Sequence, residues 1–244
     1  MTNQPGDPGM DAGAHRMGFE ERIAEVRCVL FDLDGTLIDT VELIRESMRY
    51  ATATVLGAPL PDEVLMRNVG VPLATQMREF SAEHADELVA VYREHNGRVH
   101  DIMVHEYPGT ETALEQLTHA GFTLGVVTSK SRPVALRGLE RFDLGRFFDV
   151  VIACEDVERH KPDPAPVLAG ASALGFDPAE CIYVGDSPHD MAAARDAGVL
   201  GVAALWGAFP RDVLLAPAPP FAVECMTDVP LLLAGDVERF RIHV

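Results

Sequence analysis

Five short apolar runs, each followed by a stretch with helical periodicity, constrain the fold of this chain more than any other feature of its sequence. The runs are continuous rather than alternating, which is typical of parallel strands covered by helices on both faces of a sheet. They are VRCVLF (26–31), FTLGVV (122–127), FDVVIA (148–153), CIYVG (181–185) and VLGVAA (199–204). This alternation of strands and helices predicts the α/β class with a doubly wound parallel sheet.

Three of the intervening segments have clear helix boundaries. Each of them ends directly before a glycine, the residue that most often follows the last turn of a helix. The segments are Thr110 to Ala120, Asp163 to Leu174 and Pro188 to Ala197. We therefore expect one helix over each segment.

One interval interrupts this order: the roughly 75 residues between the first strand and Pro108 contain no strand-like run. Apolar residues recur there in three- and four-residue steps, for example at Val41, Ile44 and Met48, and this is the period of an amphipathic helix. We expect an all-helical insert over residues 39–106.

The rest of the chain divides into a core domain and a tail. The core domain is expected over residues 21–38 and 107–244. Residues 1–20 are rich in Gly, Pro and Asp and contain few branched apolar side chains. Such a segment buries too little surface to offset the entropy of ordering, so we predict a flexible tail.

The charge balance of the chain excludes some partners. There are 20 Lys and Arg against 38 Asp and Glu, for a net charge of −18. Nucleic acids and anionic membranes bind clustered basic residues, so neither is an expected partner. The cysteines are too far apart for a zinc site or a disulfide scaffold; they are Cys28, Cys154, Cys181 and Cys225. With no signal peptide or membrane-spanning segment in the sequence, we expect a soluble cytoplasmic protein, monomeric or homodimeric, that acts on a small molecule.

Polar clusters follow the predicted strands where ligands bind in open α/β sheets, outside the carboxyl ends of the strands. The first strand is followed by DLDGT (32–36), the second by TSK (128–130), and the fourth leads into GDSPHD (185–190). The loop after the third strand contains KPDP (161–164). These clusters are expected to converge at one edge of the sheet.

The chemistry of these clusters favours a metal and a phosphate. Neighbouring carboxylates repel one another unless a cation neutralises them, and oxygen ligands favour a hard ion such as Mg²⁺. A lysine and hydroxyl groups at the same edge supply donors for phosphoryl oxygens. Gly35 would let the backbone approach a bound phosphate closely.

In order and spacing, these segments resemble the four motifs of the haloacid dehalogenase-like phosphohydrolase superfamily. The motifs are DLDGTLIDT (32–40), Thr128-Ser129, Lys161 in KPDP, and GDSPHD (185–190), and the resemblance covers about residues 26–207. It implies a Rossmann-like core with strand order 3-2-1-4-5 and a helical cap inserted after the first motif. Within the superfamily the chain looks most similar to the branch of phosphoglycolate phosphatases and pyrophosphatases.

The resemblance also implies roles for individual residues. Asp32 would be the nucleophile that forms a phosphoaspartate, and Asp34 the acid that protonates the leaving oxygen and then the base that activates water. Thr128 would donate to the transferring phosphoryl group, with Ser129 and Gly35 also binding substrate. Lys161 would neutralise charge on the nucleophile and the phosphoryl oxygens.

A magnesium ion is implied at the same place. Its ligands would be the Asp32 carboxylate, the Asp34 backbone carbonyl and Asp186, with Asp190 either a further ligand or a support behind them. The function expected from all of this is a Mg²⁺-dependent phosphatase for a small phosphate monoester. Phosphoglycolate is the first candidate substrate and pyrophosphate the second.

Other functions stay open at this stage. The β-phosphoglucomutase-like branch shares the core but typically has a histidine at the position of Ile44. A phospho-receiver module also uses an acidic pocket, but it lacks a second acid such as Asp34 and a helical insert. Dehalogenases of the superfamily work without Mg²⁺ and without the second aspartate.

Several polar residues have simpler explanations than catalysis. Thr128 and Ser129 could cap a helix, and Asp190 could favour a helix start through the helix dipole. Lys130 and Arg132 are expected to be solvated charges or charges at the rim of the site rather than catalytic ones. Four insert residues are candidates for meeting the far end of a substrate, although most are expected on solvated faces: Arg45, Arg67, Arg78 and Asn96.

Overall fold

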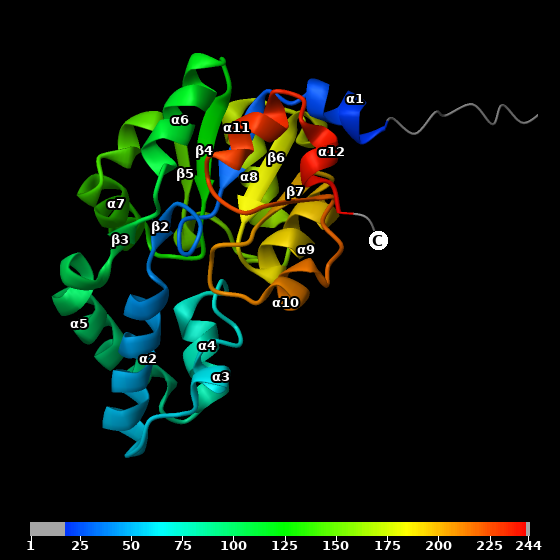
Figure 1. Cartoon of the computed structure of the whole chain (residues 1–244). Coiled ribbons are helices and arrows are strands. Elements are labelled where there is room, and N and C mark those ends of the chain that lie inside the picture. Colours follow the sequence, from blue (N-terminus) through cyan, green and yellow to red (C-terminus); the bar gives the residue numbers. More distant parts are fainter. Residues whose placement is uncertain (1–17, 243–244) are drawn as a thin grey trace, which may run out of the picture.

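The computed structural model describes residues 18–242 of the chain (Figure 1). Most of the predicted tail, residues 1–20, lies outside this range. Its last residues do not continue as a tail, because Phe19 begins helix α1 (Phe19–Ala24). The Phe19 ring packs edge-on against Phe221, with 5.6 Å between ring centroids, and Ile23 is buried. No helix in residues 18–242 is long and apolar enough to cross a membrane.

A parallel six-stranded sheet forms the centre of the core, in the order β5-β4-β1-β6-β7-β8. The strands are β1 (Cys28–Phe31), β4 (Thr123–Val127), β5 (Val150–Ile152), β6 (Cys181–Gly185), β7 (Leu200–Ala204) and β8 (Phe221–Val223). The first five lie in the predicted order 3-2-1-4-5, which is therefore confirmed. Strand β8 was not predicted; it extends the sheet at the edge next to β7.

Helices cover both faces of the sheet, which explains why the strands are apolar throughout. In β1, Cys28 and Leu30 pack toward the face covered by α8 (Ala165–Leu174) and α9 (Pro188–Ala197). The other two residues of β1 pack on the opposite face. That face is covered by α6 (Thr110–His119), α7 (Arg132–Arg141), α11 (Asp228–Leu233) and α12 (Val237–Phe240).

The predicted helices occur close to their expected bounds. Helix α9 has the bounds predicted from Pro188 and Gly198, and α8 begins two residues later than expected. Shorter elements complete the core: α10 (Arg211–Leu215) and three 3₁₀ helices, η1 (Leu144–Phe147), η2 (Cys154–Asp156) and η3 (Pro178–Glu180).

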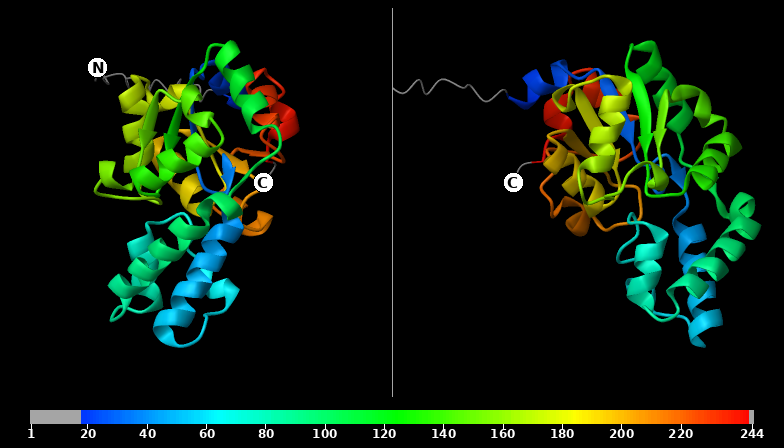
Figure 2. Two further views of the ribbon diagram at one scale, coloured as in Figure 1. Left: turned by 90° about the vertical axis from the view of Figure 1, so that its left-hand side faces the viewer. Right: turned by 180° about the vertical axis from the view of Figure 1, so that it is seen from behind.

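The long interval after the first strand is helical, as predicted, except at its two ends, where short strands occur. It contains α2 (Val41–Leu56), α3 (Asp62–Leu65), α4 (Leu73–Phe80) and α5 (Ala85–Met103). These helices form a separate hydrophobic core around Met48, Met77 and Leu88. Two short strands, β2 (Ile38–Asp39) and β3 (His105–Glu106), pair antiparallel where the insert leaves and rejoins the core. The insert lies below the sheet in Figures 1 and 2.

Candidate active site

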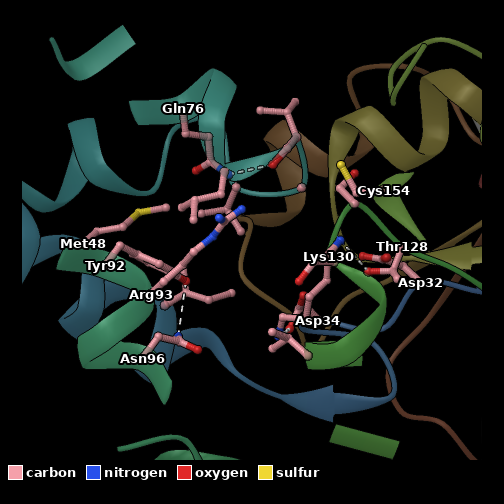
Figure 3. Close-up of a pocket in the computed structure, with 18 of the residues that line it drawn as sticks. Asp32, Asp34, Met48, Gln76, Tyr92, Arg93, Asn96, Thr128, Lys130 and Cys154 are labelled. Carbon is pink, nitrogen blue, oxygen red and sulfur yellow. Dashed lines mark hydrogen bonds and ion pairs between the residues drawn. The ribbon is translucent and has the colours of Figure 1, made fainter. Parts of the chain in front are cut away.

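The polar residues that follow separate strands come together at one edge of the sheet. Asp32 lies directly after β1, Thr128 after β4 and Asp186 after β6, and Lys161 reaches them from the loop between β5 and α8. All four are buried. A cavity of about 500 Å³ lies over the aspartates and Thr128, between this edge and the insert. Figure 3 shows the core residues on one side of this space and insert residues on the other.

Lys161 is the centre of the buried network. Its Nζ lies 2.9 Å from Asp32 Oδ1, 2.6 Å from Asp190 Oδ1 and 2.9 Å from the Tyr183 hydroxyl oxygen. These three contacts use all three donors of the ammonium group. The Tyr183 hydroxyl in turn lies 2.9 Å from the Val127 carbonyl oxygen, at the end of the neighbouring strand. Lys161 is therefore fixed in position and fully satisfied.

Asp190 holds this network together from the first turn of α9. Its Oδ2 accepts hydrogen bonds from the backbone N–H and the hydroxyl of Ser187, at 3.0 and 2.6 Å, while Oδ1 contacts Lys161 and Tyr183. Gly185 leaves room for it, since a Cβ at that position would lie 2.5 Å from the Asp190 Cβ. With both oxygens occupied by donors of the chain, Asp190 orients Lys161 and the start of α9.

Asp186 lies close to backbone atoms, and each of its carboxylate oxygens accepts one hydrogen bond and so keeps a lone pair free for a ligand. Its Oδ2 accepts the Ala208 N–H at 2.7 Å, and its Oδ1 lies 3.4 Å from the Thr36 hydroxyl. A Cβ on Gly35 or on Gly207 would lie 2.2 Å from Asp186 atoms. At Gly35 the backbone φ of +75° independently favours glycine.

The electrostatics of this cluster favour a divalent cation. Oxygens of Asp32, Asp186 and Asp190 lie within 4.8 Å of one another, and the one ammonium among them, that of Lys161, pairs with Asp32 and Asp190 but not with Asp186. Burial and the neighbouring carboxylates raise the pKa of Asp32 to about 7 against the opposing effect of Lys161, and they raise the pKa of Asp186 well above its ordinary value. Two negative charges are left without compensation, and an all-oxygen ligand set suits Mg²⁺. The residues present therefore fit the ion that the motifs imply.

Asp34 lies at the cavity, apart from that cluster. Its Oδ1 accepts a hydrogen bond from the Thr40 hydroxyl at 2.7 Å and forms an ion pair with Lys130. Of the two placements expected for Lys130, the solvated one is wrong, because its side chain is only 12% exposed and faces Asp34; the residue lies at the rim of the cavity. Its position in the sequence, directly after Thr128-Ser129, was the signal that could have placed Lys130 in the site.

Thr128 and Ser129 line the cavity and do not cap a helix. The N-cap residue of α7 is Ser131. The Thr128 hydroxyl oxygen accepts the backbone N–H of Lys130 at 3.2 Å, which forms a local turn at the end of β4. Both hydroxyl-bearing residues face the space in front of Asp32.

The insert contributes a different set of residues from the one that the sequence indicated. Of the four candidates, Asn96 lines the cavity, whereas Arg45, Arg67 and Arg78 do not. The insert residues at the cavity that were not predicted include Met48, Gln76, Tyr92 and Arg93 (Figure 3). No sequence signal marks them, because their exposure to the cavity depends on how the insert docks on the core.

Comparison with known proteins agrees with this fold. A family model described as haloacid dehalogenase-like hydrolase matches residues 29–204. Pyrophosphatase PpaX of Bacillus velezensis is 39% identical over 204 residues, which cover 84% of this chain and 94% of that protein. The PpaX protein of Halalkalibacterium halodurans is 37% identical over 205 residues, 84% of this chain and 95% of that one. The crystal structure of a hydrolase from Pseudomonas syringae has a TM-score of 0.76 at 26% identity, with 88% of this chain and 99% of that chain covered.

The chain therefore belongs to the haloacid dehalogenase-like hydrolase family, since the family match extends over most of it and the curated relatives match along nearly their whole length. Within that family it is a phosphatase. The relatives named as pyrophosphatases agree with the branch of phosphoglycolate phosphatases and pyrophosphatases that the sequence resembles.

Proposed function

We propose that this phosphatase is Mg²⁺-dependent and hydrolyses a small phosphate compound through a phosphoaspartate on Asp32. The observation that carries the proposal is the buried cluster of Asp32, Lys161, Asp186 and Asp190, of which Asp32 and Asp186 face a cavity that both core and insert line. Asp32 Oδ1 is engaged by Lys161, so Oδ2 is the oxygen left to attack phosphorus.

The reaction has two steps at this site. In the first, a bond forms between Asp32 Oδ2 and phosphorus as the bond to the leaving oxygen breaks, and Asp34 donates a proton to that oxygen. In the second, Asp34 takes a proton from water, which attacks phosphorus and releases inorganic phosphate with the Asp32 carboxylate restored. The Thr128 and Ser129 hydroxyls donate to the phosphoryl oxygens, and the backbone at Gly35 approaches them.

The Mg²⁺ ion would be held by the Asp32 carboxylate, the Asp34 backbone carbonyl and Asp186. It would supply positive charge that draws the phosphoryl oxygens toward Asp32. Asp190 supports the site by orienting Lys161, because its own oxygens already accept donors from the chain.

For the substrate, the relatives favour pyrophosphate over phosphoglycolate. Two proteins more than a third identical to this chain along nearly their whole length are named as pyrophosphatases. Phosphoglycolate, the first candidate from the sequence, becomes the second. A mutase is disfavoured by Ile44, an apolar residue packed in the core of the insert, where it cannot exchange a proton.

The test of the proposal is Asp32→Asn, assayed as phosphate release from pyrophosphate and phosphoglycolate. An amide cannot attack phosphorus effectively, so turnover should fall by several orders of magnitude with the fold intact. Asp212→Asn, a change of the same kind on helix α10 away from the cavity, should keep wild-type activity. Substantial residual activity of Asp32→Asn, or full wild-type activity in excess EDTA, would contradict the mechanism.

A further inference from the structure

Three cations line the active-site cavity, and two of them are already paired. Lys130 pairs with Asp34. Arg137 pairs with Asp101 at 2.9 Å and donates to the Gly97 carbonyl oxygen at 3.0 Å. Arg93 makes no ion pair or side-chain hydrogen bond with any residue between 18 and 242. It is the one free cation among the described residues that face the substrate space.

Arg93 comes from helix α5 of the insert, opposite the core residues that would handle the phosphoryl group. Figure 3 shows its side chain extending from α5 into the space between insert and core. Its charge acts across the cavity on the core: burial and Glu155 raise the pKa of the Cys154 thiol, and the guanidinium partly offsets that rise. Arg93 is an exposed residue on the insert side of the cavity that Asp32 lines from the core side, so the far end of a substrate bound at Asp32 can reach it.

The surroundings of Arg93 add no competing charge from the insert. Its neighbours on that side of the cavity are apolar or uncharged, including Met48, Tyr92 and Asn96. The Gln76 side chain is 5% exposed, donates through Nε2 to the Val71 carbonyl oxygen at 2.7 Å, and leaves its Oε1 without a partner. A planar guanidinium in such surroundings binds carboxylate or phosphate oxygens through paired N–H donors.

We propose that Arg93 binds an oxyanion carried by the leaving group, and so selects substrates with a second anionic group. This inference rests on the proposed function and defines its substrate class. The shared chemistry is an oxyanion a few bonds from the transferring phosphorus: the second phosphate of pyrophosphate or the carboxylate of phosphoglycolate. Phosphate esters with a neutral leaving group lack this contact.

The test measures binding without turnover. In the Asp32→Asn background with saturating Mg²⁺, calorimetry gives Kd for pyrophosphate, phosphoglycolate and methyl phosphate, with and without Arg93→Gln. Loss of a charged hydrogen-bonding partner should weaken one or both of the first two ligands about 10- to 100-fold and leave methyl phosphate within about threefold. Arg93→Lys should restore part of the loss. Arg98→Gln, which removes the same charge from the same helix outside the cavity lining, should change none of the three.

The outcomes separate this inference from the proposed function. A larger loss for pyrophosphate assigns the contact to phosphate, and a larger loss for phosphoglycolate assigns it to carboxylate. An equal loss for all three ligands, or no loss for any, would overturn the role of Arg93. The proposed function fails separately, if the protein with Asp32 intact hydrolyses none of these compounds. Even in that case the binding measurements still test whether Arg93 binds the second anionic group.

Discussion

Glycine residues shape this site as much as the aspartates do. Gly207 faces Asp186 so closely that a Cβ would lie 2.2 Å from the Asp186 Cβ and 2.3 Å from its Oδ2. An added Cβ would therefore have to displace the Asp186 side chain or the backbone at Gly207. The glycine is therefore part of the proposed metal site although it donates nothing to it.

Gly207→Ala should displace Asp186 and raise the Mg²⁺ concentration needed for half-maximal activity, with a lower maximal rate. The measurement is a magnesium titration of phosphate release. The matched control is Gly145→Ala, because a Cβ at Gly145 meets nothing within 4 Å. Identical titration curves for the two variants would show that Asp186 does not need its present position.

The sequence could reveal a site residue when that residue directly follows a strand, but not when its contact depends on strand register or on the backbone. Asp32, Thr128 and Asp186 follow apolar strands directly, and strands of a parallel sheet place such residues at one edge. Tyr183 was missed because its hydroxyl reaches Lys161 only through the register of β6 beside β1. Ala208 was missed because it binds Asp186 through its backbone, which no side-chain pattern reports.

At the scale of elements, the start of α9 ties helix stability to the site. Ser187 is the N-cap residue, Pro188 occupies the first turn, and the Ser187 hydroxyl exchanges hydrogen bonds with Asp190. The same Asp190 carboxylate orients Lys161. The local rules that begin a helix thus also position a charged group of the site.

Ser187→Ala should lower the free energy of unfolding by about 1 kcal/mol, the usual loss for an N-cap side chain. Denaturant unfolding of the metal-free protein measures this. Ser172→Ala, an exposed position in α8 with no capping role, should change it by less than about 0.5 kcal/mol. Equal values for the two variants would argue that the Ser187 hydroxyl contributes no capping energy.

The elements that were predicted and those that were missed differ in length. Long continuous runs such as Cys181–Gly185 indicated their strands clearly. Strand β8 has three residues and directly follows Pro219 and Pro220, so composition favoured a loop. Helix α1 has six residues next to a Gly- and Pro-rich segment, and it is held by packing of Phe19 on β8, a contact distant in sequence.

For the whole molecule, the attachment of the insert matters most. The only covalent connections between insert and core run through β2 and β3. The insert loop at Gly70 also approaches the core, because a Cβ at Gly70 would lie 3.0 Å from the Ser187 Oγ. We propose that residues 39–106 move as one unit about these two strands, closing the cavity on the substrate.

Hydrogen exchange with Mg²⁺ and beryllium fluoride, a phosphoryl mimic that binds aspartate, tests this motion. Exchange should slow in residues 67–73 and in the two linking strands, and stay unchanged in β1 and β6. Asp32→Asn, which cannot bind the mimic, should show no such change. Uniform protection across core and insert would contradict a hinge.

The uncompensated charge around Lys161 also sets a trade-off between activity and stability. Burial raises the pKa of Asp186 well above its ordinary value, so without metal the fold loses stability as the pH rises from the ordinary carboxyl pKa up to that raised pKa, where the unfolded chain has already released the proton. Asp186→Asn should therefore melt higher than the wild type in EDTA at pH 8, by about 2–4 °C for each kcal/mol of repulsion removed, and lose this advantage near pH 4. Asp212→Asn should gain nothing. If the wild type melts as high as Asp186→Asn in EDTA, that trade-off is absent. If Asp186→Asn melts higher, the carboxylate that binds the metal ion makes the metal-free enzyme less stable.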